Sequence, residues 1–154
     1  MIQVEIPGHS PLTIEAVVFD VNGTLACDGV LIEGVRTRIE KLRQQVAVHL
    51  LTADTHGKQA AVDAALGLQA HIIQHGGAEK GSFVLSLGAD SVAVVGNGAN
   101  DSAMFNAAAL RIAVLGPEGM ATALLSQSDI LVRDINDALD LLLYPQRLAA
   151  TLRR

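Results

Sequence analysis

The stretch FDVNGTLACDG, from Phe19 to Gly29, begins where an apolar segment ends abruptly on an aspartate. The preceding residues, AVVF at 16–19, are apolar without interruption, which is typical of a strand buried on both faces. A buried strand that ends on a bare carboxylate needs a reason, because an ionised side chain loses its hydration in such a place. Asp20 is therefore the first candidate for a functional residue.

Similar short apolar segments recur along the chain and alternate with stretches that have helical spacing. Strands that are apolar throughout and alternate with helices predict an α/β fold. We expect a doubly wound, Rossmann-like parallel sheet with helices on both faces. The predicted strands are 16–20, 46–52, 70–74, 91–96, 110–116 and 129–132, and the predicted helices are 33–45, 135–143 with a continuation past Pro145, and four that begin near His56, Glu79, Ala99 and Glu118.

The N-terminal segment IQVEI at 2–6 alternates apolar and polar residues and precedes a Pro-Gly turn. This pattern predicts a half-exposed edge strand or hairpin. The chain has 154 residues, and neither a linker nor an internal repeat interrupts it. We therefore expect a single domain that spans 1–154.

The composition limits the partners of the chain. Half of the residues are hydrophobic and only 3% are aromatic, which predicts a core of Ala, Val, Leu and Ile. The formal net charge of −5 does not suit binding to nucleic acid or to an anionic membrane. Cys27 is the single cysteine, the N-terminus lacks the layout of a signal peptide, and no apolar stretch reaches the roughly 18 residues of a membrane span. We expect a cytoplasmic protein.

Small and polar residues gather where the predicted strands end and the next helices begin. In open parallel sheets this edge is where ligands bind, so we expect these residues to lie together. The first strand ends at Asp20, with Asn22, Gly23 and Thr24 following, and the second ends at Thr52, with Asp54 following; Lys80 lies in the helix after the third strand, and Asn97, Asn100 and Asp101 follow the fourth.

At these residues the chain resembles the haloacid dehalogenase (HAD) superfamily of aspartate-nucleophile phosphotransferases. DVNGTL at 20–25 resembles the first motif of that superfamily, Thr52 matches the second, Lys80 the third, and GNGAND at 96–101 the fourth. The four motif sequences are most similar to those of the phosphorylation domain of P-type ATPases, which are DKTGTL, TGD, a lysine and GDGxND. The resemblance extends over nearly the whole chain from Val17 onward, and four motifs in order are specific where one alone is weak.

The resemblance implies a reaction that is chemically sensible for these residues. A carboxylate and a phosphate repel each other by about 1 kcal/mol at ~4 Å in water, and by ~4 kcal/mol at an effective dielectric of about 20. Mg²⁺ and Lys80 would offset that repulsion, and Asp20 would attack phosphorus and become an aspartyl phosphate. The implied phosphate-binding residues are Gly23, Thr24, Thr52, Ala53, Lys80 and Asn100, and the implied Mg²⁺ ligands are Asp20, Asn22 through its backbone carbonyl, Asn97 and Asp101.

Each candidate also has a structural explanation. Asp20 could form an Asx turn, Thr52 could cap a helix, and Asp101 could favour a helix dipole. GNGAND resembles a dinucleotide-binding loop as well, but the third glycine of G-x-G-x-x-G would fall on Asp101, whose charge would repel pyrophosphate. We therefore reject the dinucleotide reading and favour the catalytic one.

Two positions depart from the superfamily pattern. Asn22 stands where most HAD phosphatases have an aspartate that acts as general acid and base, and an amide cannot give up a proton near neutral pH. Asn97 stands where the fourth motif usually opens with aspartate, so one charge is lost from the metal shell. We expect slow breakdown of the aspartyl phosphate, or activity limited to good leaving groups, and weaker binding of Mg²⁺.

The spacing of the motifs leaves no room for a cap domain. The interval from Thr24 to Thr52 fits a turn and one helix, and the interval from Thr52 to Lys80 fits a helix, a strand and a turn. Neither holds the nucleotide-binding domain of a P-type ATPase, so ion transport is not expected. Some uncapped relatives close their active sites by forming oligomers. The sequence leaves open whether this chain forms a homo-oligomer, either a dimer or a tetramer.

We predict a Mg²⁺-dependent phosphatase-type hydrolase that acts on a small phosphorylated compound, with Asp20, Asn22, Thr52 and Lys80 as the catalytic set. A nearly inactive relative that binds phosphate compounds or regulates a partner protein is the alternative, motivated by Asn22 and Asn97. Haloacid dehalogenation ranks last, because it needs no metal and gains nothing from a metal-binding fourth motif.

Overall fold

A six-stranded sheet forms the centre of the chain, in a computed structural model that describes residues 1–54 and 57–154. The strand order is β10–β9–β8–β3–β6–β7, and each neighbouring pair is parallel. This confirms the predicted doubly wound α/β sheet. The strands are β3 (Ala16–Asp20), β6 (Ala47–Thr52), β7 (His71–Ile72), β8 (Val92–Gly96), β9 (Leu110–Val114) and β10 (Ile130–Val132).

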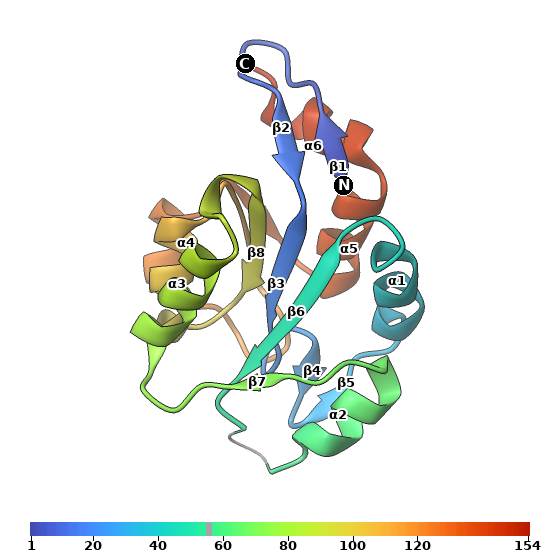
Figure 1. Ribbon diagram of the computed structural model, residues 1–154, viewed down its shortest axis with the longest axis vertical. Coiled ribbons are helices and arrows are strands. Elements are labelled where there is room, and N and C mark those ends of the chain that lie inside the picture. Colours follow the sequence, from blue (N-terminus) through green and yellow to red (C-terminus); the bar gives the residue numbers. More distant parts are fainter. Residues whose placement is uncertain (55–56) are drawn as a thin grey trace.

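Helices cover both faces of this sheet. Helices α1, α2 and α5 pack on one face and α3 and α4 on the other, so that the sheet is the middle layer of three (Figure 1). The α-helices are α1 (Val35–Leu42), α2 (Gln59–Leu66), α3 (Gly77–Ser86), α4 (Ser102–Ala107), α5 (Ile135–Leu143) and α6 (Pro145–Leu152), and the 3₁₀ helices are η1 (Ala89–Ser91), η2 (Ala99–Asp101) and η3 (Thr122–Ser126). None of the helices in the described residues is long and apolar enough to cross a membrane.

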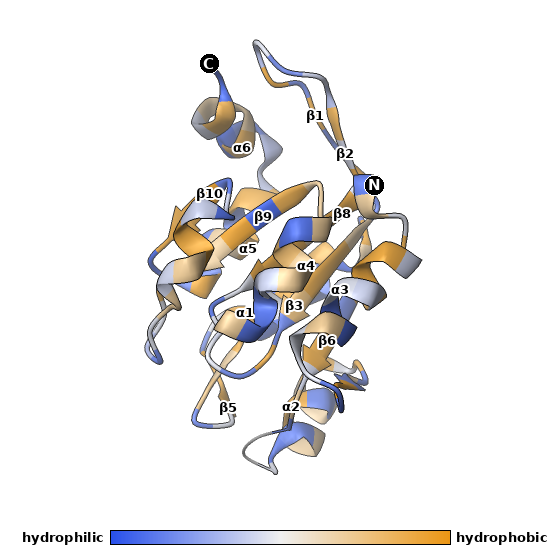
Figure 2. Ribbon diagram, turned by 90° about the vertical axis from the view of Figure 1, so that its left-hand side faces the viewer, coloured by the Kyte–Doolittle hydropathy of each residue, from blue (hydrophilic) through white to orange (hydrophobic). Residues whose placement is uncertain are grey.

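The continuous apolar run in β3 reflects burial on both faces, because every residue of this strand is buried. Val17 and Phe19 belong to the core cluster under α1 and α5, whereas Val18 belongs to the cluster under α3 and α4. Each such side chain contributes roughly 1.5–3 kcal/mol when it leaves water. The sheet strands are mainly hydrophobic, whereas the helices mix hydrophobic and hydrophilic residues (Figure 2). Asp20 therefore lies at the end of a strand that is buried along its whole length.

The N-terminal segment forms the predicted hairpin. Strands β1 (Ile2–Val4) and β2 (Leu12–Ile14) pair antiparallel as a separate two-stranded sheet. Ile2 and Val4 are buried while Gln3 between them is exposed, as the alternation predicts. The hairpin lies beside α6, away from the edge of the central sheet (Figure 1).

A short second hairpin was not predicted. Between Thr24 and α1 the chain forms β4 (Ala26–Cys27) and β5 (Val30–Leu31), joined through Asp28 and Gly29. Both turn residues have positive φ angles, 51° and 77°, and Asp-Gly is the common sequence for such a turn. The prediction of a turn and one helix in this interval therefore missed one element, the β4–β5 hairpin.

Two predicted helix starts also need comment. The helix expected near Glu118 is wrong, because residues 116–119 form a turn with a bridge between Gly116 and Gly119, and the helical segment that follows is the 3₁₀ helix η3. The start expected near His56 lies outside the described residues, and the described helix α2 begins at Gln59. In the described residues, the intervals between the motifs hold small elements and no cap domain.

Candidate active site

The carboxyl ends of β3, β6 and β8 bring three of the predicted site residues to one edge of the sheet. β3 lies between β6 and β8, with Asp20 opposite Leu51 and Phe19 opposite Val95. Asp20 and Thr52 are the last residues of their strands, and Asn97 directly follows Gly96 at the end of β8.

Lys80 forms two buried ion pairs at the centre of this edge. Its Nζ donates to Asp20 Oδ1 at 2.6 Å and to Asp101 Oδ1 at 2.7 Å. Lys80 and Asp101 are fully buried, and Asp20 is 5% exposed. One ammonium thus faces two carboxylates, which leaves the cluster with an excess of negative charge when both are ionised.

Glycines in α3 explain how Lys80 reaches this position. A Cβ on Gly77 would lie 2.6 Å from the Asn100 carbonyl oxygen, and one on Gly81 would lie 3.0 Å from Ala103 Cβ. Because both positions lack side chains, α3 packs closely against η2 and α4. The local sequence GAEKG therefore carries the lysine into the interior.

The electrostatics of the cluster follow from burial. Burial raises the pKa of Asp20 to about 7, the charge of Asp101 adds to the rise, and Lys80 and Thr24 oppose it. Burial lowers the pKa of Lys80, but Asp20 and Asp101 outweigh this effect and the net pKa of Lys80 is raised. A bound cation near Asp20 would relieve the repulsion between the two carboxylates.

Thr24 and Asn97 present oxygen atoms beside Asp20. Thr24 Oγ1 lies 3.2 Å from Asp20 Oδ2 and 3.2 Å from Asn97 Oδ1. Asn97 Nδ2 donates to the Gly119 carbonyl at 3.0 Å, which turns the amide oxygen toward Thr24. Gly23 has φ of 80°, and a Cβ there would lie 2.5 Å from Asn97 Nδ2, so only glycine allows this approach.

Asp101 holds the GNGAND loop from inside. Its Oδ2 accepts the backbone N–H groups of Asn97 at 3.0 Å and Gly98 at 2.9 Å, while its Oδ1 accepts Lys80. A Cβ on Gly96 would lie 2.4 Å from Asp101 Oδ2, which explains the glycine at the end of β8. Asp101 thus positions both the loop and the lysine.

Thr52 is prepared to donate a hydrogen bond. Its Oγ1 accepts Asn22 Nδ2 at 3.2 Å and the Asp54 N–H at 2.9 Å. A hydroxyl has two lone pairs and one proton, so with both lone pairs in use the proton is left for a further acceptor. A phosphate oxygen is such an acceptor.

A polar cavity of about 300 Å³ opens over this edge. Five of the candidate site residues line it, namely Asp20, Asn22, Ala53, Asn97 and Asn100, whereas Lys80, Thr24 and Thr52 are fully buried and do not line it. Its other lining residues are Gly98 and Glu118. Sequence reasoning missed Glu118 as a site residue, although it follows β9, whose carboxyl end lies at the same edge.

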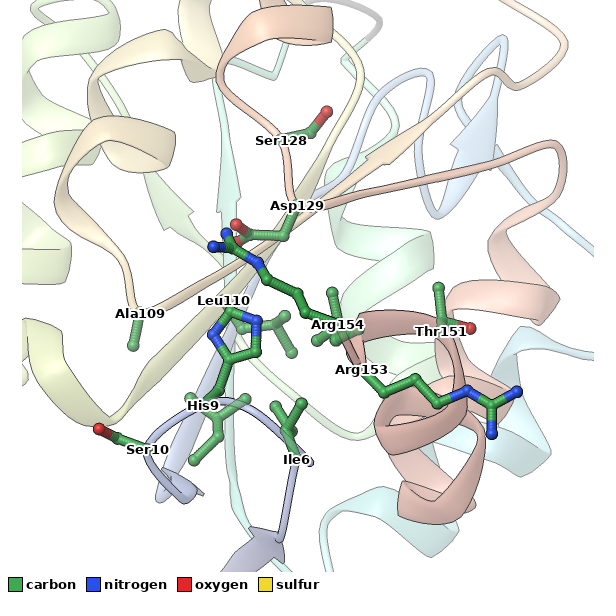
Figure 3. A pocket seen from close by; sticks show the side chains of 12 residues that line it. Ile6, His9, Ser10, Ala109, Leu110, Ser128, Asp129, Thr151, Arg153 and Arg154 are labelled. Carbon is green, nitrogen blue, oxygen red and sulfur yellow. The ribbon is translucent and has the colours of Figure 1, made fainter.

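A larger cavity of about 660 Å³ lies at the opposite end of β9 and β10 (Figure 3). His9 and Arg154 face it, together with Asp129. The Asp129 carboxylate is already paired with Arg111, which donates to it through Nε at 2.9 Å and Nη2 at 2.7 Å. None of the predicted site residues lines this cavity, so its size does not make it the candidate active site.

No family model matches the chain, but two curated relatives do. An uncharacterized protein of Methanocaldococcus jannaschii is 50% identical over 62 residues, which cover 40% of this chain and 67% of that protein. A second uncharacterized protein of the same organism is 41% identical over 39 residues, which cover 25% of this chain and 89% of that protein. The chain belongs to one family with these two proteins, whose names carry no activity.

Solved structures of HAD superfamily proteins share the fold. A phosphoserine phosphatase, as an analogue of its phospho-aspartyl intermediate, matches with a TM-score of 0.65 and 17% identity, over 83% of this chain and 98% of its own. A protein assigned to HAD subfamily III A from Legionella pneumophila gives 0.67 and 20%, over 90% and 87%. The 3-deoxy-D-manno-octulosonate 8-phosphate phosphatase of Moraxella catarrhalis, in complex with magnesium ion, phosphate ion and KDO, gives 0.63 and 18%, over 89% and 92%.

Proposed function

Because this chain has the fold of the HAD superfamily and no cap domain in its described residues, we propose that it is a Mg²⁺-dependent phosphatase-type hydrolase. The observation that carries the proposal is the setting of Asp20. Its carboxylate lines the polar cavity, with Lys80 on one oxygen and Thr24 on the other. A carboxylate held in this way has a fixed direction of attack.

The oxygen atoms around Asp20 suit a hard cation. Asp20, the Asn22 carbonyl and Asn97 Oδ1 would hold Mg²⁺, because Mg²⁺ prefers carboxylate and carbonyl oxygens and the amide of Asn97 already turns its oxygen this way. The ion would supply positive charge that stabilises the phosphoryl oxygens. Asp101 was also a predicted ligand, but its oxygens are engaged by Lys80 and two backbone N–H groups. We assign to Asp101 a positioning role behind the metal site.

The reaction has two steps on Asp20. In the first, a carboxylate oxygen of Asp20 bonds to phosphorus, the bond to the leaving oxygen breaks, and the electron pair departs with that oxygen. The Thr52 hydroxyl donates a hydrogen bond to a phosphoryl oxygen, and the Lys80 ammonium, 2.6 Å from Asp20 Oδ1, favours the ionised form of Asp20 against the effect of burial. In the second step a water oxygen bonds to phosphorus, the bond between phosphorus and the Asp20 oxygen breaks and restores the carboxylate, and phosphate leaves while the protons of the water pass to the phosphate oxygens and to solvent.

Asn22 restricts the leaving group. Its amide donates to Thr52 at 3.2 Å and cannot give a proton to a departing alkoxide. Substrates that leave as stable anions, such as acyl or aryl phosphates, are therefore favoured. For the same reason the aspartyl phosphate should break down slowly and accumulate.

The same two substitutions support a second candidate function. With Asn22 and Asn97 in place of carboxylates, the site retains groups that bind phosphate but loses a proton donor and a metal charge. The chain would then bind phosphate compounds with little or no turnover.

One experiment separates the two functions. The protein is incubated with Mg²⁺ and acetyl phosphate, alongside Asp20→Asn and the matched control Asp90→Asn, whose carboxylate is exposed in η1. We expect phosphate release and an acid-stable phosphoryl adduct on the Asp20 peptide in the wild type and control, and neither in Asp20→Asn. Equal background release by all three, together with retained phosphate binding, would establish the binding function instead.

A further inference from the structure

We propose that the substrate carries an apolar body that lies in a groove between the β4–β5 hairpin and α2. The groove lies beside the polar cavity that Asp20 lines, called the catalytic cavity below. This inference rests on the proposed function and specifies its substrate class. The hairpin and α2 lie at the end of the molecule toward which β3 and β6 run (Figure 1). The groove therefore flanks the same edge of the sheet as Asp20.

The groove is hollow and apolar. It encloses about 660 Å³, and Val30 on its rim is 63% exposed. Alanines on α2 leave the space open, because their side chains are too short to fill it. The lining residues are Gly29, Val30, Leu31, Gly57, Lys58, Ala60, Ala61, Val62 and Ala65.

A single residue joins the groove to the catalytic cavity. The Asp28 N–H donates to Glu118 Oε2 at 3.1 Å, and Glu118 lines the catalytic cavity. The Asp28 carbonyl accepts Lys58 Nζ at 3.1 Å, and Lys58 lines the groove. Asp28 thus lies between the two hollows as a shared wall, and the substrate would extend from the catalytic cavity past Asp28 into the groove.

The catalytic cavity needs such an extension. Small-molecule sites usually enclose about 300–1,000 Å³ and are mostly apolar with a few placed polar groups. This cavity lies at the lower limit and is lined almost entirely by polar side chains and glycine or alanine. It fits a phosphoryl group, and the apolar contacts that would bind the rest of the substrate are supplied by the groove.

Position and lining support a substrate as the occupant. The groove is lined mainly by Gly, Ala, Val and Leu and lies beyond Asp28 from the catalytic cavity, which suits the apolar part of a molecule whose phosphate binds at Asp20. The charges at Asp28 are mixed, because Lys58 lies there together with the carboxylates of Asp28 and Glu118. A second copy of this chain is the competing occupant. The groove would then be a contact between two copies, and the length of the substrate would not affect the reaction.

The test uses acyl phosphates of increasing length, namely acetyl, butanoyl, hexanoyl and octanoyl phosphate, because their leaving carboxylates are chemically alike. We expect kcat/KM of the wild type to rise about three- to fourfold for each methylene that enters the groove. Ala61→Glu and Val30→Lys should flatten this gradient. Ala64→Glu, an exposed position on the same helix outside the groove, should retain it.

A binding measurement keeps this inference separate from the proposed activity. Calorimetry with Mg²⁺ and the ethyl, butyl, hexyl and octyl phosphonates should give the same gradient in affinity, which Ala61→Glu flattens. If no acyl phosphate is turned over but the phosphonate gradient holds, the proposed hydrolysis fails and the groove stands. Affinity and kcat/KM that do not change with chain length would overturn the inference, as would a wild-type dimer that Ala61→Glu dissociates without any gradient.

Discussion

Replacement of Asp20 by asparagine should stabilise the metal-free protein increasingly as the pH rises. Burial, with the charge of Asp101, raises the pKa of Asp20 from an ordinary 3.8 to about 7. Between these values the folded protein holds a proton that the unfolded chain has lost, so the free energy of unfolding falls as pH increases. Asp20→Asn has no titratable group at this position, so its free energy of unfolding does not fall in this way.

The magnitude follows from the displacement of the pKa. Each unit corresponds to about 1.4 kcal/mol, so a rise from 3.8 to about 7 corresponds to about 4 kcal/mol in total. From about pH 5 to pH 7 the stability of the variant relative to the wild type should grow by about 1.4 kcal/mol per pH unit and then level off. The offset at pH 5 also contains the altered hydrogen bonds of Lys80 and Thr24, so the slope is the informative quantity.

Denaturant unfolding in the presence of EDTA, followed by circular dichroism at closely spaced pH values, measures this slope. Asp90→Asn is the matched control, because it removes the same charge from an exposed position and should parallel the wild type. A difference between wild type and Asp20→Asn that stays constant or shrinks as pH rises would refute the reasoning, since Asp20 would then be ionised in the folded protein at all these pH values.

Three further substitutions test single groups. Asn97→Asp adds a carboxylate beside Asp20 and should lower the Mg²⁺ concentration at the midpoint of a thermal-shift titration; an unchanged midpoint would count against Asn97 as a ligand. Asn22→Asp supplies a group that exchanges protons and should speed decay of the phosphoenzyme by about 10²–10⁴-fold, whereas equal rates in a quench assay would remove residue 22 from proton transfer. Asp101→Asn must turn its NH₂ toward Lys80 to keep accepting the loop N–H groups, so urea unfolding should show a loss of about 1–3 kcal/mol; no loss would contradict the ion pair.

Much of the fold follows from periodicity. The apolar runs predicted β3 with its observed bounds and placed β6, β8 and β10 within a residue, because a strand buried on both faces leaves an unbroken apolar run. The helix at 135–143 is also observed with its predicted bounds. The β4–β5 hairpin was not predicted, because strands of two residues show no periodicity and only the Asp28-Gly29 turn indicated it.

The sequence indicated which residues belong to the candidate site, but not how deeply each of them is buried. Strand ends located Asp20, Thr52 and Asn97, since parallel strands bring their carboxyl ends to one edge. Nothing in the sequence indicated that Lys80 is wholly enclosed, because this depends on the close packing of α3 against η2 and α4. Glu118 was missed for a related reason: its turn reaches the cavity through the fold, without a motif of its own.

The enclosure of Lys80 has a chemical consequence. The chain has three lysines, and Lys41 and Lys58 are exposed whereas Lys80 is fully buried between two carboxylates. Amine-directed electrophiles should therefore acylate the first two and spare the third while the native packing persists. Labelling of Lys80, read by mass spectrometry, would mark the fraction of molecules whose interior has opened to solvent.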